Sequence, residues 1–157
     1  MKFNKIQSFA KINLTLKILK KLPNGYHEIE SLISKISLAD EILIKEVNGK
    51  KNKITFNGNF SSGISNSNTI SKLLKILIDQ NHIKNKKFNI KIKKNIPQSS
   101  GMGGGSMNAA SILNYFIKKK MIKTTKKGLI KIANKIGSDV ILGLYDSPVI
   151  LHGKQYI

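Results

Sequence analysis

Alternating apolar and polar residues predict several β-strands in this chain. Between Phe9 and Ile18, every second residue from Ile12 onward is apolar, which is the pattern of a strand with one buried face. Lys11 and Asn13 would share the opposite face, roughly 7 Å apart at about 3.3 Å of rise per residue. Further β-segments are predicted at 28–38, 41–47, 53–56, 88–93 and 148–151, with a hairpin turn at 48–52 and a loop at 57–67.

Three segments have the apolar spacing of amphipathic helices instead. The first opens at Asn68 or Thr69, and its apolar stripe is Ile70, Leu73, Leu74, Leu77 and Ile78. The second follows Ser106, a candidate N-cap, with the stripe Ala109, Ala110, Leu113, Phe116 and Ile117. The third carries Leu129, Ile130, Ile132, Ala133 and Ile136 and ends at Gly137 in the C′ position.

Length and composition suit one globular domain over residues 1–157. A chain of this length buries about 68–70% of its unfolded surface, and 40% of the residues are hydrophobic. Cysteine is absent, which excludes disulfides and thiolate metal sites. No apolar run approaches 18 residues and no signal peptide opens the chain, so a membrane span is excluded and a cytoplasmic enzyme domain is expected.

The net charge of +20 raises the alternative of an RNA-binding module. All 28 basic residues are lysine, however, and the abundant lysine, isoleucine and asparagine share AT-rich codons, so genomic drift would produce the same bias. Arginine reads phosphates and guanine edges bidentately, and its absence weakens the nucleic-acid interpretation.

The most unusual stretch runs from Pro97 to Ala110, between the predicted strand 88–93 and the second helix. Four glycines fall within residues 101–105, and such a cluster costs ordering entropy unless close backbone approach is needed. Free N–H groups and a helix N-terminus would converge there, which predicts an anion site. The loop matches neither a Walker A motif nor G-x-G-x-x-G, and a flexible linker is the alternative.

The motif Pro97-x-x-x-Gly101-Met102-Gly103-Gly104-Gly105-Ser106-x-Asn108-Ala109-Ala110 resembles the ATP-phosphate loop of the GHMP kinases. Two other segments agree in the same order: Ala10-Lys11-Ile12-Asn13-Leu14 with Gly25-Tyr26-His27, and Gly137-Ser138-Asp139-Val140. The resemblance implies the α+β fold of a GHMP kinase N-terminal domain, a mixed sheet packed on helices that also resembles a domain of a ribosomal protein.

The same resemblance implies a phosphoryl transfer from ATP, with Mg²⁺, to an alcohol. Lys11 and Asp139 would be catalytic, with Asp139 acting on the acceptor hydroxyl and Lys11 holding that carboxylate ionised. Independently, Asp139 stands before an apolar run where burial requires a cationic or metal partner; a helix N-cap is the alternative. The implied ATP-binding residues are Pro97, Gln98, Ser99, Ser100, Gly101, Met102, Gly103, Gly104, Gly105, Ser106, Met107 and Asn68.

The implied acceptor is a cytidine diphosphate-linked methylerythritol, phosphorylated on its 2-hydroxyl on the route to isoprenoid precursors. Asn13, Tyr26 and His27 would bind it, with Tyr26 stacking on cytosine and His27 hydrogen-bonding the base edge. A Tyr-His pair that merely opens a strand is the alternative for these two residues. Asn68 would lie near adenine, although a helix N-cap accounts for it equally.

The chain departs from the family in two respects. Met107 stands where the family has a second serine whose hydroxyl can reach the metal ion. The family also has a C-terminal subdomain of similar size, and we expect it to be absent from this chain. The activity of such a short form stays open: it would be a kinase, a truncated inactive remnant that at most binds ATP, or one half of a split enzyme whose partner chain supplies the second subdomain.

Overall fold

One long strand, β3 (His27–Val47), organises the sheet in the computed structural model, which describes residues 2–83 and 85–155. Its second half pairs antiparallel with β1 (Asn4–Asn13) on one side and β5 (Lys87–Lys93) on the other, and β4 (Lys53–Asn57) adds to β5 in parallel. Its first half pairs with β2 (Lys17–Lys21) and β6 (Val149–Gln155). The six strands therefore form one mixed sheet.

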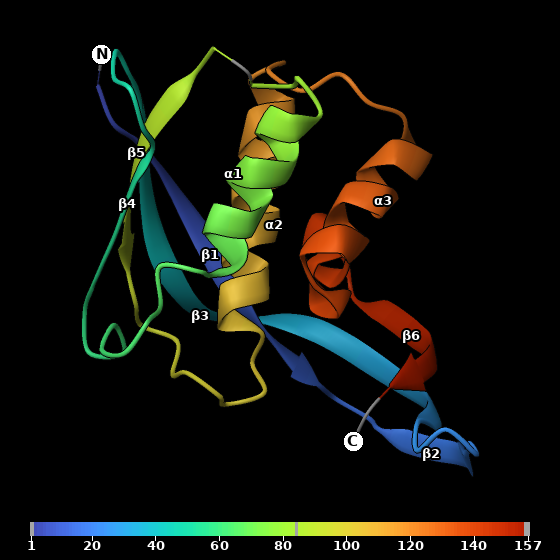
Figure 1. Cartoon of the computed structure of the whole chain (residues 1–157). Helices are drawn as coiled ribbons and strands as arrows, with labels where there is room; N and C mark the ends of the chain where they lie inside the picture. Colours follow the sequence, from blue (N-terminus) through green and yellow to red (C-terminus); the bar gives the residue numbers. More distant parts are fainter. Residues whose placement is uncertain (1, 84, 156–157) are drawn as a thin grey trace.

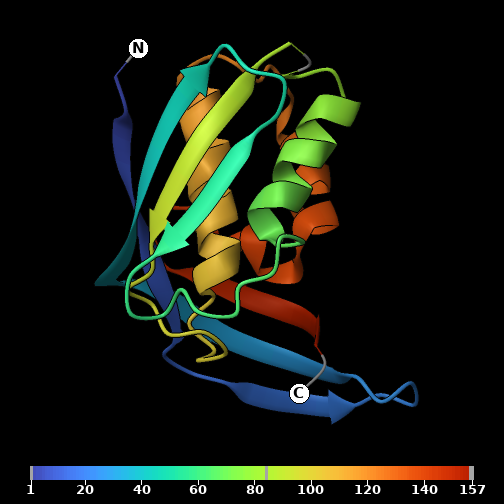
Figure 2. The same cartoon turned by 60° about the vertical axis from the view of Figure 1, so that its left-hand side comes forward.

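Helices cover one face of this sheet (Figures 1 and 2). In the described part of the chain these are α1 (Thr69–Asp79), α2 (Gly104–Lys118) and α3 (Lys126–Ile136). Two short 3₁₀ turns, Ser138–Val140 and Leu142–Leu144, connect α3 to β6. The α+β prediction, a mixed sheet packed on helices, is confirmed. Within residues 2–83 and 85–155, every helix is too short or too polar to cross a bilayer.

The core lies between the helices and the second half of β3. Ile42 and Ile44 pair with Ile92 and Ile90, and none of these four is exposed. Phe88 of β5 packs against Phe116 of α2 with ring centroids 4.7 Å apart. Full burial of such a side chain contributes about 1.5–3 kcal/mol, so this layer accounts for most of the packing energy. The first half of β3 extends beyond the helices together with β2 and β6 (Figure 1), and we call these three strands the arm.

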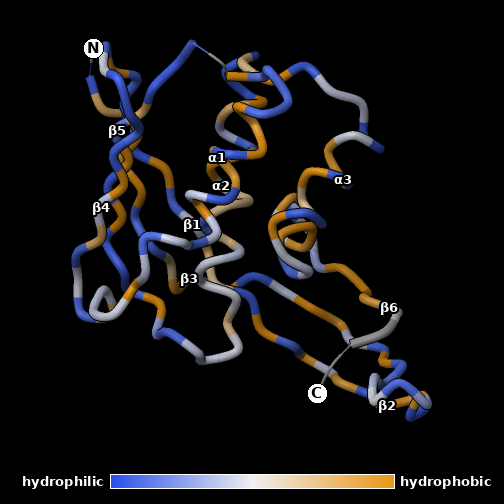
Figure 3. Tube along the Cα trace, in the orientation of Figure 1, coloured by the Kyte–Doolittle hydropathy of each residue, from blue (hydrophilic) through white to orange (hydrophobic). Residues whose placement is uncertain are grey.

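The prediction of one continuous strand over residues 9–18 is wrong, although residues 9–13 and 17–18 do lie in strands. β1 ends at Asn13, where Leu14 N–H donates to Leu32 O at 2.8 Å, and β2 begins only at Lys17. The face expected to be buried is open, because Leu14, Leu16 and Ile18 are all more than half exposed. Alternation shows which residues share a face, but burial requires a covering layer. Met107 of α2 packs against Ile33 of β3, whereas Leu14, Leu16 and Ile18 have no such cover. Figure 3 shows hydrophobic segments in this uncovered region.

Two further strand predictions are corrected. The segments 28–38 and 41–47 form one continuous strand, and the predicted hairpin between 41–47 and 53–56 does not exist. β5 lies between β3 and β4, and β4 runs parallel to β5. The physical reason is that β5 pairs with β3 over seven residues and places Ile92 and Ile90 opposite Ile42 and Ile44, a non-local gain that the local turn signal cannot reveal.

The helix stripes are confirmed, but one helix start is not. Ile70, Leu73, Leu74 and Leu77 are buried on α1. α2 begins at Gly104, two residues before the predicted cap Ser106, because Gly103 takes the capping position in the left-handed conformation with φ of 68°. Gly137 follows α3 directly, in extended backbone.

Gly58 provides a test of the packing between the loop 58–67 and β5. A Cβ at Gly58 would lie 2.7 Å from Lys94 O, in backbone with φ of +91°, whereas one at Gly63 (φ +74°) meets nothing within 4 Å. Gly63→Ala should cost about 1 kcal/mol for the positive φ alone. Gly58→Ala should cost about 1–3 kcal/mol more because of the clash. Urea unfolding measures both, and equal costs would contradict this packing.

Candidate functional site

The glycine-rich loop between β5 and α2 presents an open helix N-terminus. Ser99, Gly101 and Gly103 have positive φ values of 55°, 73° and 68°. The first hydrogen bond of α2 runs from Met107 N–H to Gly103 O at 2.8 Å, so the N–H groups of residues 104–106 have no acceptor within the helix. No side chain caps this end and no acidic residue lies in the first turn. This arrangement favours an anion.

A cavity of about 370 Å³ lies in front of this N-terminus. Of the residues predicted to bind ATP, those that line it are Pro97, Gln98, Ser99, Ser100, Gly101, Gly103, Gly104, Gly105 and Asn68. Met102, Ser106 and Met107 do not line it. Met107 is buried in a small apolar cluster with Ile33 and Leu142, so it contributes packing and no polar group.

The opposite wall of the cavity belongs to the loop 58–67 and the start of α1. The Gln98 amide donates to Phe60 O at 2.9 Å and to Ser62 O at 2.7 Å. Thr69 Oγ1 donates to Gly105 O at 2.7 Å. These contacts join the two walls across the cavity.

Asn68 is the N-cap of α1, as the alternative interpretation of this residue predicted. Its Oδ1 accepts the N–H groups of Ile70 and Ser71, both at 3.0 Å, and the Ser71 hydroxyl completes a capping box. Its side chain also faces the cavity. A cap and a ligand contact are therefore both compatible with this position.

The structure brings Lys11 and Asp139 together beside the loop. Lys11 Nζ lies 3.8 Å from Asp139 Oδ2, and the Lys11 residue is only 8% exposed. Asp139 sits inside the turn Ser138–Val140, so it is not a helix N-cap. The Lys11 N–H donates to Met102 O at 3.1 Å, and a Cβ on Gly103 would lie 3.2 Å from Lys11 Cγ. Gly103 is thus required both for its positive φ and for the close approach of the lysine.

A chain of hydrogen bonds continues from this pair along β1. Lys11 Nζ donates to Asn13 Oδ1 at 2.8 Å, and Asn13 Nδ2 donates to Ser31 Oγ at 2.8 Å. The Ser31 hydroxyl donates to Thr15 O at 2.6 Å. The predicted proximity of Lys11 and Asn13 is confirmed, and their orientation is set by a fully buried serine on β3.

Tyr26 and His27 lie away from the ion pair, at the turn between β2 and β3. Asn13 pairs with Ile33, so His27 is roughly 20 Å further along β3 at about 3.3 Å per residue. Tyr26 is 41% exposed, and His27 Nδ1 is buried without a hydrogen-bond partner in the part of the chain that the structure describes. This separation requires any ligand that reaches both groups to be elongated.

Sequence reasoning missed a buried cluster below the loop: Asp40, Lys94 and Asn108. Lys94 and Asn108 line the cavity, and Asp40 forms an ion pair with Lys94. The alternation along two strands did contain a signal for this buried pair. Lys94 continues the inward series Phe88, Ile90 and Ile92, and Asp40 precedes Ile42 and Ile44 in the same phase. Opposite charges at inward positions of two strands indicate a buried pair.

Within residues 2–83 and 85–155, no group of three or more His, Cys, Asp or Glu side chains could hold a metal ion. Asp139 is the carboxylate beside the phosphate loop, with its side chain 27% exposed. Mg²⁺ is commonly held by one or two carboxylates together with substrate phosphates. The donor set therefore fits a magnesium–nucleotide complex and does not fit an independent metal site.

This fold places a glycine-rich, anion-favouring helix N-terminus beside a buried ion pair, and sequence comparison gives the family. The profile described as GHMP kinases N terminal domain matches residues 68–154, so the chain belongs to the GHMP kinase family. The resemblance inferred from the three motifs is confirmed.

The names of individual relatives specify a substrate. The chain is 59% identical over 147 residues to a 4-diphosphocytidyl-2-C-methyl-D-erythritol kinase of Pelagibacter ubique, covering 94% of this chain and 52% of that protein. It is 38% identical over 149 residues to the kinase of the same name from Fervidobacterium nodosum, covering 95% of this chain and 51% of that protein. The chain thus spans about half the length of the curated relatives it matches.

Solved structures share the fold. A crystal structure of 4-(cytidine 5′-diphospho)-2C-methyl-D-erythritol kinase matches with a TM-score of 0.78 at 24% identity, over 96% of this chain and 52% of that one. A mevalonate kinase from Staphylococcus aureus matches with a TM-score of 0.58 at 18% identity, over 87% and 45% of the two chains.

Asn68 can be tested as a cap and as a ligand contact separately. Asn68→Ala should lower the free energy of unfolding by about 1 kcal/mol, whereas Asn66→Ala, at an exposed neighbouring position, should not change it. Asn68→Ser keeps a capping oxygen and removes the amide. Unfolding curves test the cap. A loss of Mg-ATP affinity in the serine variant at unchanged stability would assign the amide to the nucleotide.

Proposed function

We propose that this chain carries the nucleotide-binding and catalytic part of an ATP-dependent kinase that phosphorylates the 2-hydroxyl of 4-diphosphocytidyl-2-C-methyl-D-erythritol. The observation that carries the proposal is the Lys11–Asp139 pair, 3.8 Å apart, beside the uncapped N-terminus of α2. The names of the relatives support the acceptor, and the family supports ATP.

The ATP phosphates would lie on the amides of residues 103–106. These groups are pre-organised by the loop backbone and by the helix dipole, so they need little reorganisation when charge moves onto the transferred phosphoryl group. Asp139 and the phosphates would hold Mg²⁺, which supplies charge neutralisation on the phosphate oxygens when bound. The buried Met107 supplies no metal contact.

Asp139 would accept the proton of the acceptor hydroxyl. As that proton leaves, the oxygen forms a bond to the γ-phosphorus, and the bond from that phosphorus to the β,γ-bridging oxygen breaks to release ADP. Lys11 would hold a positive charge beside Asp139, and its own position is set by Asn13 and by the bond from its N–H to Met102 O. A positioned base of this kind contributes about 10²–10⁴ in rate.

The acceptor would stretch along β3 from the ion pair to the arm. Tyr26 would stack on the cytosine and His27 would hydrogen-bond its edge, while Asn13 would contact the polyol. The roughly 20 Å between Asn13 and His27 along the strand suits an elongated molecule in which a diphosphate separates a nucleoside from a four-carbon polyol.

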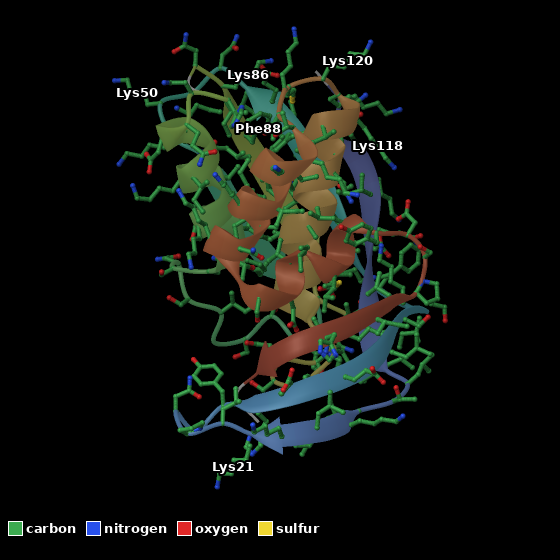
Figure 4. The ribbon with its side chains drawn as sticks, turned by 90° about the vertical axis from the view of Figure 1, so that its right-hand side faces the viewer. Lys21, Lys50, Lys86, Phe88, Lys118 and Lys120 are labelled. Atoms are coloured by element: carbon green, nitrogen blue, oxygen red, sulfur yellow. The ribbon has the colours of Figure 1, made fainter. Side chains whose placement is uncertain are left out.

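Further polypeptide would complete the cleft, from a longer protein or from a partner chain that supplies the second subdomain. The exposed apolar side chains Leu14, Leu16, Ile18 and Leu19 of the arm support this. The RNA-binding alternative draws its support from surface lysines; Lys50, Lys86 and Lys120 project at the end of the molecule opposite Lys21 (Figure 4). Filter binding of RNA at physiological salt tests it.

Asp139→Asn should reduce ATP-dependent turnover of the acceptor by about 10²–10⁴-fold. The matched control is Asp146→Asn, because Asp146 has a side chain 94% exposed and contacts Lys35 at 3.3 Å. A coupled assay of ADP release on the purified chain measures both. Equal turnover in Asp139→Asn and the unmodified chain would refute the role of Asp139.

Ligand-induced stabilisation tests binding separately from turnover. Mg-ATP at a hundred times its Kd should stabilise the chain by about 2.7 kcal/mol, a rise in Tm of roughly 5–10 °C for this size. Cytidine diphosphate should also raise Tm, and Tyr26→Leu should abolish only that second shift. Tyr145→Leu is the control, because Tyr145 is similarly exposed at 38%. No shift with Mg-ATP would remove the nucleotide site.

A further inference from the structure

Asp40 is the most completely buried charge in the described chain, with no exposed surface. Its Oδ1 accepts the N–H groups of Asn95 at 2.7 Å and Ile96 at 2.8 Å. Its Oδ2 accepts from Asn108 Nδ2 at 2.9 Å and from the Lys94 ammonium. Both oxygens of one carboxylate are therefore occupied by groups that flank the glycine-rich loop.

These bonds connect three separate elements. Asp40 belongs to β3, Asn95 and Ile96 lead into the loop at Pro97, and Asn108 lies in the second turn of α2. Asn95 Nδ2 adds a bond to Ala39 O at 2.9 Å on the same strand. The loop thus starts and ends on segments that are bonded to one side chain of the central strand.

Lys94 adds an electrostatic interaction to the hydrogen bonds between Asp40 and the segments that flank the loop. A Cβ on Gly104 would lie 3.1 Å from Lys94 Nζ, so the ammonium is adjacent to the first residue of α2. A cation at a helix N-terminus is unfavourable unless an anion neutralises it, and Asp40 supplies that anion. Asn108 donates its Nδ2 to Asp40, while its Oδ1 is buried without a partner among residues 2–83 and 85–155.

We propose that Asp40 is a positioning residue that fixes the phosphate loop of this kinase. It holds the entry of the loop and the start of α2 at one distance from β3, so that the amides of residues 103–106 converge. The proposal rests on the proposed function for its effect on ATP. The effect of Asp40 on the position of the loop can be measured without a ligand.

The main variant is Asp40→Leu/Lys94→Met, which removes both buried charges together, because apolar replacement of a whole ion pair is generally tolerated by the fold. The N–H groups of Asn95 and Ile96 then lose their acceptor. Amide hydrogen exchange over residues 97–103 should accelerate roughly tenfold to hundredfold, the range for a hydrogen bond to a charged group. Affinity for Mg-ATP should fall in parallel, while exchange in β1 and α1 stays unchanged.

Two controls isolate the role of the carboxylate oxygens. Asp40→Asn/Lys94→Met keeps an oxygen that accepts the two backbone N–H groups, so slow exchange and most of the Mg-ATP affinity should return. Glu41→Gln/Lys93→Met removes the charges at the neighbouring positions, which lie opposite each other on the same two strands with Lys93 exposed. Glu41 forms its ion pair with Lys5 at 2.7 Å, and the loss of such a solvent-accessible pair costs little. This variant should behave like the unmodified chain.

Faster exchange spread evenly over the whole chain in the main variant would overturn the proposal, because Asp40 would then support the fold and not the loop. Unchanged exchange and affinity would also overturn it. If the main variant does not fold, Asn108→Leu, which breaks only the link to α2, decides by the same two measurements. If the unmodified chain does not bind Mg-ATP, the proposed function fails. Amide hydrogen exchange over residues 97–103 then tests the positioning role by itself.

Discussion

The close approach of Lys11 to Gly103 is the constraint on which the site depends. A side chain at position 103 would meet the methylene groups of the lysine at 3.2–3.4 Å, and its backbone would be strained at φ of 68°. Because glycine stands there, β1 can donate its Lys11 N–H to the loop and place the ammonium beside Asp139. The absence of a side chain at position 103 therefore allows the glycine-rich loop, β1 and the turn Ser138–Val140 to lie together.

Buried charge is concentrated around this junction. The described chain buries Lys11, Asp40 and Lys94 among its charged residues, and all three lie next to the glycine-rich loop or its flanks. Burying ions costs several kcal/mol each unless partners compensate, so a fold selected for stability alone would replace them with apolar side chains. At the uncapped N-terminus of α2 such partners are present: Lys11 lies beside Asp139, Lys94 pairs with Asp40, and Asp40 also accepts two backbone N–H groups.

The arm, in contrast, exposes apolar side chains. Its strands are well paired, yet Leu14, Leu16, Ile18 and Ile150 remain more than half exposed because no helix covers them. Half of the length of the curated relatives lies outside the matched region. The uncovered apolar side chains support the proposal that further polypeptide closes the ligand site.

Short-range pattern was enough to predict the three helices and the glycine-rich loop between a strand and a helix, because these depend on local periodicity and on backbone freedom that single residues encode. The proximity of Lys11 and Asp139 was expected only from the resemblance to a known family, because the two residues lie far apart in the chain. The order of the sheet, the break after Asn13, the start of α2 at Gly104 and the Asp40–Lys94 cluster were decided by tertiary structure. Strand pairing and burial arise from contacts between segments far apart in the chain. The same alternation of residues is therefore buried in β5, where helices cover it, and exposed in β2, at the edge of the arm.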